Sequence, residues 1–240
     1  MGKLKGVNMN QKKWSELNNY FTEIIDTLVT NCSLGDFFDD FLKEEYHDGG
    51  FCKFTHSSYD KFVENIDYGA SKLCIIPFES ESDFVLKIPL PNASRNYCEI
   101  EAENYSLAVA AGVESFFAEC VAINEYTWKN GSIPLYVMKR ARVDEEEVYL
   151  SSGNDMIPSG YYYDGEIVST SMDGKASWHS GNECEGEEVV EDLFWKVYHS
   201  SKLLEKFWEF ISENNINDLH EKNVGFLDDG SVVCIDYSGY

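Results

Sequence analysis

Polar side chains that can do chemistry gather near the end of the chain. Asp218, His220 and Asn223 lie in the polar stretch "NDLHEKN", and Asp236 follows the next apolar stretch. Carboxylate, imidazole and amide groups can accept hydrogen bonds, bind cations or exchange protons. Polar groups at both ends of one short apolar segment are more typical of a functional site than of an ordinary surface. We therefore treat these residues as a candidate site.

The segment between these groups is predicted to form a β-hairpin. Asp229-Gly230 is a strong turn signal, and apolar residues on either side of it alternate with the period of a strand: Val224, Phe226, Val232 and Cys234. The hairpin would present Asn217–Asn223 on the loop by which the chain enters it, and Asp236 where the chain leaves it.

The other elements are predicted from hydrophobic periodicity. Helical spacing predicts helices within 11–45, over 97–111 and over 187–213. Period-two patterns predict three strands between 60 and 90, and two more around the turn "KNG". Residues 142–186 are rich in Gly, Ser and acids, which predicts a connection with a small hairpin at "YYYDGEIV".

This order of elements resembles the protein-kinase-like family, and several motifs carry the resemblance. Asp218–Asn223 resembles the catalytic loop, whose aspartate and asparagine stand five apart, and Asp236–Gly239 resembles the metal-binding Asp-Phe-Gly element. "VLK", which ends at Lys87, resembles the strand lysine. "FVENIDYGASKLCIIPF" resembles the first two strands with the phosphate loop between them. The resemblance spans about Phe62 to Gly239.

The chain also departs from the family pattern. Ile216-Asn217 stands where the family has His-Arg, as in some divergent phage and bacterial kinase-like proteins. Tyr237 replaces the Phe of the metal-binding element, one residue is inserted before its glycine, and the phosphate loop keeps only Gly69. Because only Tyr240 follows Gly239, we expect a minimal family member with a truncated C-terminal lobe.

The resemblance implies a role for each motif. Asn223 and Asp236 would hold Mg²⁺ through hard oxygen ligands, with phosphate and water completing the octahedron. Asp218 would orient or deprotonate the attacking hydroxyl, and Lys87 would bridge the α- and β-phosphates of ATP. The implied cofactors are therefore ATP and Mg²⁺.

The family also has a helix glutamate that holds the strand lysine. The candidates on the predicted helix are Glu99, Glu101 and Glu103. We expect the stripe formed by Ile100, Leu107 and Ala111 to face the sheet. Because Glu103 lies beside this stripe, Glu103 is the predicted partner of Lys87.

Two further segments would bind the nucleotide. Backbone N–H groups of the phosphate loop would cap the phosphates, with Ser71 or Lys72 assisting: Gly69, Ala70, Ser71 and Lys72. The last strand would end at Met138, with Lys139 to Ala141 as the hinge that offers backbone hydrogen bonds to adenine.

The resemblance implies an α+β, two-lobed, protein-kinase-like fold. Its N-lobe would be an antiparallel sheet with one helix, and its reduced C-lobe mainly helical with a β-hairpin. The predicted boundaries are a helical extension over 1–50, an N-lobe over 51–141, a connection over 142–186 and a minimal C-lobe over 187–240.

Each motif residue has a commoner explanation when taken alone. Asp218 and Asn223 could be turn or capping residues, Lys87 could be an exposed edge lysine, and Asp236 could belong to a frayed terminus. We favour the functional interpretation because these residues occur together, in the right order and in the right predicted elements.

Composition limits the partners and the compartment. A net charge of −24 and a pI near 4.4 argue against a nucleic-acid or anionic-membrane surface, since both partners are polyanions, and would attract a basic partner. Seven scattered cysteines without CxxC indicate reduced thiols in a cytosol. No apolar stretch is long enough to span a membrane, so we expect a cytoplasmic protein.

Two hypotheses of different class follow. The first is an active ATP- and Mg²⁺-dependent kinase that acts on a hydroxyl, of a protein in preference to a small molecule, with a basic protein as one candidate. The alternative is a catalytically inactive kinase-like module that binds a nucleotide, or a partner through its acidic surface. A nucleic-acid-mimicking acidic decoy ranks last.

Overall fold

The protein is α+β and divides into two compact units. The computed structural model describes residues 11–31, 63–68, 71–78, 80, 82–90, 93–128, 131–144, 147–148, 162–163, 166–170, 176–180 and 184–239. Unit 1 comprises Met1–Ser106 and Glu119–Arg140, and unit 2 comprises Leu107–Ala118 and Ala141–Tyr240. The predicted segment 32–45, Gly69 and Ala70 lie outside the described residues.

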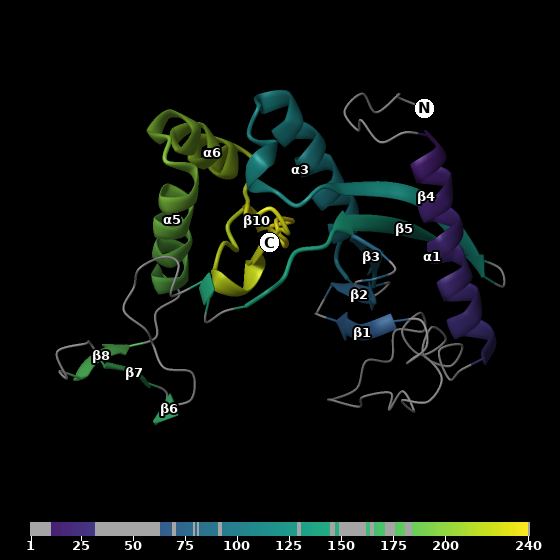
Figure 1. Ribbon diagram of the computed structural model, residues 1–240, viewed down its shortest axis with the longest axis horizontal. Coiled ribbons are helices and arrows are strands. Elements are labelled where there is room, and N and C mark those ends of the chain that lie inside the picture. The colour runs from purple at the N-terminus through teal and green to yellow at the C-terminus, as the bar shows by residue number, and fades with distance from the viewer. Residues whose placement is uncertain are drawn as a thin grey trace. The chain divides into compact units, whose positions relative to one another are not determined.

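Unit 1 is built on a five-stranded antiparallel sheet, as its sequence predicts (Figure 1). The strands follow the order β1-β2-β3-β5-β4 and are β1 (Val63–Tyr68), β2 (Lys72–Pro77), β3 (Phe84–Pro89), β4 (Cys120–Trp128) and β5 (Gly131–Lys139). Three successive strands form a meander, and β4 and β5 form a long hairpin at its side. Strand β3 is therefore central, and its residue Lys87 is no edge lysine.

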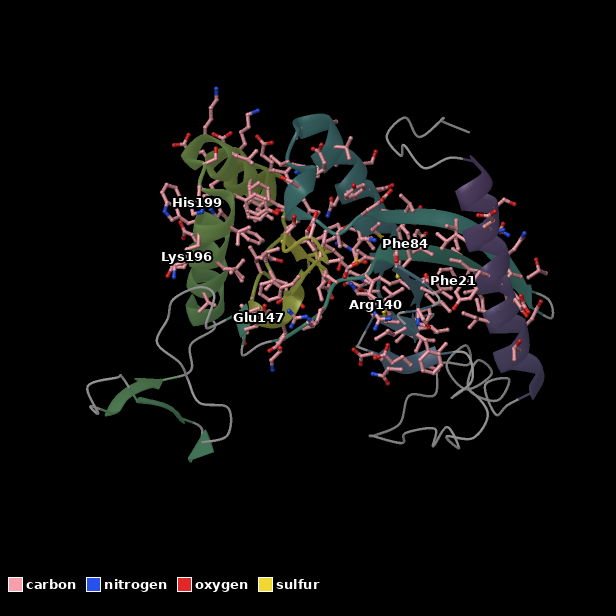
Figure 2. All side chains as sticks on the ribbon, viewed as in Figure 1. Phe21, Phe84, Arg140, Glu147, Lys196 and His199 are labelled. Carbon is pink, nitrogen blue, oxygen red and sulfur yellow. The ribbon has the colours of Figure 1, made fainter. Side chains whose placement is uncertain are left out.

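The two faces of this sheet have different chemistry. One face carries the apolar residues that alternate along the strands, among them Leu73, Ile75 and Leu86, and it packs against α1 (Gln11–Asn31). Phe21 and Ile25 of α1 are buried in this core, and Figure 2 shows Phe21 between α1 and the sheet. The helix α1 therefore packs its apolar residues on the apolar face of the sheet.

The helix predicted over 97–111 is confirmed as α3 (Tyr97–Ala111), but its predicted buried stripe is wrong. Leu107 is 50% exposed, and Ala111 is exposed too. The buried face instead carries small or polar residues at helical spacing: Cys98, Glu101, Asn104 and Ala108. The stripe was misassigned because the residues that α3 buries are mostly not the apolar ones on which periodicity depends. The helix ends at Gly112, which takes a left-handed φ of 74°.

The helix predicted over 187–213 is two helices, α5 (Cys184–Tyr198) and α6 (Ser201–Glu213). His199 breaks the helical path with a φ of 47°, and the Ser200 side chain caps α6 by accepting a hydrogen bond from Leu203 N. Figure 2 labels His199 at this junction. Apolar spacing continues through the break, so periodicity alone could not reveal it. Among the described helices, none combines the length and apolar character that crossing a bilayer requires.

Aromatic rings form the centre of unit 2. Phe207 of α6 stacks on Phe116 of the short 3-10 turn η1 (Glu114–Phe116), with ring centroids 4.4 Å apart. Phe194 of α5 and Phe117 also contact Phe207, at 5.2 and 5.6 Å. These four rings are each 3% exposed or less, and they anchor α5 and α6 to the chain that follows α3.

The closing hairpin is confirmed as β9 (Val224–Phe226) and β10 (Val232–Cys234), paired antiparallel. The small hairpin predicted at "YYYDGEIV" is also present as β6 (Tyr162–Tyr163) and β7 (Glu166–Thr170). An unpredicted third strand, β8 (Ala176–Ser180), pairs with β7.

Candidate functional site

Two lysines and one glutamate form a buried ionic cluster in unit 1. Lys87 Nζ lies 3.0 Å and 2.9 Å from the two carboxylate oxygens of Glu101, and Lys72 Nζ lies 2.6 Å from Glu101 Oε1. The Glu101 side chain is fully buried, and the lysine side chains are 8% and 9% exposed. Buried charges persist when they are paired and hydrogen-bonded, as these are.

Sheet register brings the two lysines to one face. Cys74 of β2 pairs with Lys87 of β3, so their side chains point the same way. Lys72 lies two residues before Cys74, and side chains two apart share a face. That face is opposite to the apolar face covered by α1, and α3 presents Glu101 to it.

The predicted partner of Lys87 was Glu103, and this assignment is wrong. Glu101 makes the ion pair, whereas Glu103 is exposed to solvent. Two residues along a helix rotate a side chain by more than half a turn. Glu103 was chosen because it lies beside the predicted apolar stripe. That stripe is not the buried face of α3, so the choice of glutamate was wrong as well.

Asn96 fixes the start of α3 and ties it to the sheet. Its Oδ1 accepts a hydrogen bond from Glu99 N at 3.1 Å, and its Nδ2 donates to Tyr136 Oη on β5 at 2.8 Å. The first bond caps the helix, and the second joins the cap to the strand beside Lys87. Sequence reasoning missed Asn96, although "NYCE" matches the spacing of a capping box.

Cysteines beside the cluster are neutral thiols. Burial raises the pKa of Cys74 to about 11 and that of Cys98 to about 12, with the lysines opposing and Glu101 adding to the rise. Cys120 has a raised pKa for the same reasons. These three and Cys234 are free thiols.

The residues predicted to bind adenine lie at the end of β5. Met138 is 1% exposed within the sheet, and Lys139 N already donates to Glu119 O at 2.8 Å. The Lys139 ammonium lies 3.4 Å from Asp83 and over the Phe84 ring, which Figure 2 labels. The N–H of Lys139 is therefore engaged within the sheet, and adenine binding by Met138, Lys139 and Ala141 stays a prediction.

Two of the four predicted phosphate-loop residues, Ser71 and Lys72, lie in the part of the chain that the structure describes. Ser71 O accepts a hydrogen bond from Leu90 N at 2.9 Å, which ties the start of β2 to the end of β3. Lys72 is the first residue of β2, and its side chain turns to Glu101. Glu101 was not predicted to hold Lys72, and phosphate binding by Ser71 and Lys72 stays a prediction.

In unit 2, the predicted catalytic loop has a defined internal structure. Asn223 Nδ2 donates to Asp218 O at 2.8 Å, so the two residues five apart meet. His220 caps the 3-10 turn η2 (Glu221–Asn223) by accepting from Lys222 N, and its Nε2 lies 3.5 Å from Asp218 Oδ1. Leu219, 6% exposed, anchors the loop from inside.

The hairpin brings Asn223 and Asp236 together. Ile235 N donates to Asn223 O at 2.9 Å, which extends the β9–β10 pairing by one residue pair. Asp236 follows Ile235 directly, and its Oδ1 accepts a hydrogen bond from Ser238 Oγ at 3.1 Å. The two predicted metal ligands therefore lie at the same end of the ladder.

The residues after Asp236 are held in place by burial. Tyr237 is 1% exposed, donates its hydroxyl hydrogen to Ala118 O at 2.6 Å, and packs its ring against Phe117. Gly239 has a φ of 66°, and a Cβ there would overlap Asn215 O. Glycine is needed here for two reasons: it tolerates the positive φ, and it has no Cβ to clash with the neighbouring carbonyl. These contacts fix the backbone of the segment that resembles Asp-Phe-Gly.

Metal binding by Asn223 and Asp236 stays a prediction, and their carboxylate and amide oxygens are ligand types that hard divalent cations prefer. The bond from Asn223 Nδ2 to Asp218 O orients the amide, and Asp236 directly follows Ile235, whose N–H donates to Asn223 O. Within the described ranges, no group of three His, Cys, Asp or Glu could hold a metal alone. A Mg²⁺ ion here would complete its shell with phosphate oxygens and water, as Mg²⁺ commonly does.

Comparisons with known proteins do not identify a family for this chain. No family model matches the chain, and no curated protein matches it. The solved structure of the bifunctional kinase-methyltransferase WbdD is similar at a TM-score of 0.32 and 12% identity, over 74% of this chain. This chain spans 34% of that protein's length. Function must therefore be argued from the residues themselves.

Proposed function

We propose that this chain is a kinase-like phosphotransferase that uses ATP and Mg²⁺ to phosphorylate a hydroxyl group, on a protein in preference to a small molecule. One observation carries the proposal. A strand lysine, Lys87, is held by both carboxylate oxygens of a helix glutamate, Glu101, on the polar face of an antiparallel sheet. A buried, bidentate pair of this kind positions an ammonium group for phosphate oxygens.

The residues of unit 1 would bind and orient the phosphates. Phosphoryl transfer needs few covalent steps from the protein, so its catalysis depends mainly on positioning and on charge neutralisation. Lys87 is fixed at two points on Glu101, and Glu101 is fixed by α3, whose first turn is tied to Tyr136 through Asn96. Rigid support of this kind keeps the ammonium group in place when a ligand arrives.

The residues of unit 2 would orient the acceptor and hold the metal. Asp218 lies on a loop braced by Asn223 and His220, where its carboxylate could orient the attacking hydroxyl or accept its proton. Asn223 and Asp236 would supply two oxygen ligands from adjoining ends of one hairpin. Bound Mg²⁺ would neutralise charge on the triphosphate.

A protein acceptor of basic character is favoured by charge. The chain carries a net charge of −24, which attracts cationic surfaces and repels anionic ones. A small-molecule hydroxyl remains the competing acceptor, because the same machinery serves both.

The first experiment measures nucleotide binding. Thermal unfolding would be followed with ATP, with and without Mg²⁺, for wild type, Asp236→Asn and the matched control Asp228→Asn. Asp228 is exposed in the hairpin turn. A ligand at 100 times its Kd stabilises the native state by about 2.7 kcal/mol. We expect a Mg²⁺-dependent rise in wild type and control that is lost in Asp236→Asn.

The second experiment measures transfer. Wild type and Asp218→Asn would be incubated with labelled ATP, Mg²⁺ and a generic basic protein, and label in protein would be quantified. Transfer by wild type but not by Asp218→Asn supports the proposal. Mg²⁺-dependent binding without transfer to any acceptor would identify a non-catalytic kinase-like binding module instead. Absence of nucleotide binding in wild type would overturn the proposal.

A further inference from the structure

We propose that Lys72 is a second phosphate-binding residue, and that Glu101 holds Lys72 and Lys87 as one pair that selects a chain of phosphoryl groups over a single phosphate. The inference rests on the proposed function, because it concerns the ligand of the same site. It concerns a residue on β2, one strand away from the lysine on which the proposed function depends.

The first support is convergence. Both ammonium groups bond the same oxygen, Glu101 Oε1, at 2.6 Å and 3.0 Å. The two nitrogen atoms are therefore separated by no more than the sum of these distances. Oxygens on neighbouring phosphoryl groups of a polyphosphate span a comparable separation, so one ligand can meet both nitrogens.

The second support is the balance of buried charge. Lys87 and Glu101 would neutralise each other as a simple pair, and Lys72 adds a second buried cation. Asp67 of β1 lies on the same face, opposite Cys74, and is exposed. The three buried side chains together carry a formal charge of +1, although the whole chain carries −24. An anionic ligand that reached these side chains would meet two ammonium groups and one carboxylate.

The third support is the position of Lys72 in the chain. Lys72 opens β2 directly after Ser71, whose carbonyl is fixed by Leu90 N. The backbone that leads into Lys72 is therefore anchored on β3. Burial of the lysine side chain to 9% exposure costs desolvation, and an apolar residue at this position would avoid that cost. A cation that is both anchored and desolvated is suited to binding an anion.

The test uses inorganic ligands, so that adenine and metal contacts do not contribute. Binding of tripolyphosphate, pyrophosphate and orthophosphate to the full chain would be measured by calorimetry in EDTA at constant ionic strength. The variants are Lys72→Met, Lys87→Met and the control Lys206→Met, which removes an exposed lysine of α6. MgATP binding would be measured in parallel on each protein.

We expect wild type and Lys206→Met to bind tripolyphosphate more tightly than orthophosphate. Lys72→Met should weaken tripolyphosphate binding at least tenfold and reduce the preference for tripolyphosphate over orthophosphate. A purely structural role for Lys72 would lower all affinities together and leave that preference unchanged, which would overturn the inference. If Lys72→Met does not fold, Lys72→Gln takes its place, with the same expectation.

Two other outcomes separate this inference from the proposed function. If Lys72→Met binds tripolyphosphate like wild type while Lys87→Met does not, Lys72 is no phosphate ligand, and the proposed function stands. If wild type binds neither MgATP nor tripolyphosphate, both the proposed function and the inference fail.

Discussion

At the scale of single residues, Glu101 is the carboxylate that joins two buried lysines of unit 1. It is fully buried and accepts hydrogen bonds from two lysines. Removing one partner of a buried ion pair costs about 3–5 kcal/mol, because the remaining charge is left without compensation. Replacing Glu101 should therefore lower the stability of the folded chain.

Replacing Glu101 by Gln tests this dependence. Glu101→Gln keeps the shape of the side chain but leaves two buried ammonium groups beside a neutral amide. We expect a loss of about 3 kcal/mol in the free energy of unfolding, measured by urea titration, and a weaker effect of MgATP on the melting temperature.

Glu103→Gln is the matched control, since Glu103 lies on the same helix but is exposed. Its free energy of unfolding should stay within about 0.5 kcal/mol of wild type. Equal losses in the two variants would contradict the assignment of Glu101 as the buried partner of Lys87.

At the scale of elements, α1 and α3 position the sheet from opposite faces. The apolar face is covered by α1, and α3 presents Glu101 to the polar face. Tyr126 of β4 joins α1 to the sheet by donating its hydroxyl hydrogen to Asp26 at 2.7 Å. A helix held by one specific bond as well as by apolar contact has a defined position along the sheet.

This bond predicts a pH dependence. Burial, and then the hydrogen bond to Asp26, raise the pKa of Tyr126 from 10.0 to about 12. The folded protein thus holds this proton more tightly than the unfolded chain does, so the contribution to stability is complete below pH 10 and is lost as the pH rises toward 12. Urea unfolding between pH 9 and 11 should show a steeper loss for wild type than for Tyr126→Phe.

The control is Tyr97→Phe. Tyr97 lies on α3, away from the bond between α1 and β4, and its hydroxyl contacts the exposed Ser94. Its pH profile should follow wild type. A Tyr126→Phe profile parallel to wild type over this pH range would show that the α1–β4 bond does not contribute in solution.

At the scale of the whole molecule, the net charge of −24 is the dominant electrostatic property. Like charges repel each other more strongly in a compact state than in an expanded one, so a large net charge destabilises the folded chain. Salt screens this repulsion, with a Debye length of about 10 Å at 0.1 M.

Salt should therefore stabilise this protein. We expect the melting temperature at pH 7.5 to rise as NaCl increases from 20 mM to 500 mM. The rise should shrink as the pH approaches the pI of about 4.4, because the net charge then falls toward zero. A melting temperature that falls with salt at pH 7.5 would mean that attractive ion pairs outweigh the repulsion.

The sequence by itself determined the strands of the five-stranded sheet and the closing hairpin. Alternation of apolar residues was sufficient for all strands of the five-stranded sheet, and Asp229-Gly230 marked the closing hairpin correctly. These features depend on interactions between residues near one another in the chain, which local patterns record. The order of Lys87, Asp218, Asn223 and Asp236 could be read in the same way, but their catalytic roles stay predictions.

Only the tertiary structure decided which side chains meet. Glu101, Lys72 and Lys87 come from three elements, and their meeting depends on sheet register and on the rotation of α3. The buried face of α3 includes Glu101 and Asn104, so a pattern based on apolar residues pointed to the wrong face and to Glu103. Likewise, the break at His199 follows from backbone geometry while apolar spacing continues across it. Long-range pairing of polar groups leaves no periodic trace in the sequence, because each partner is chosen by the packing of distant segments.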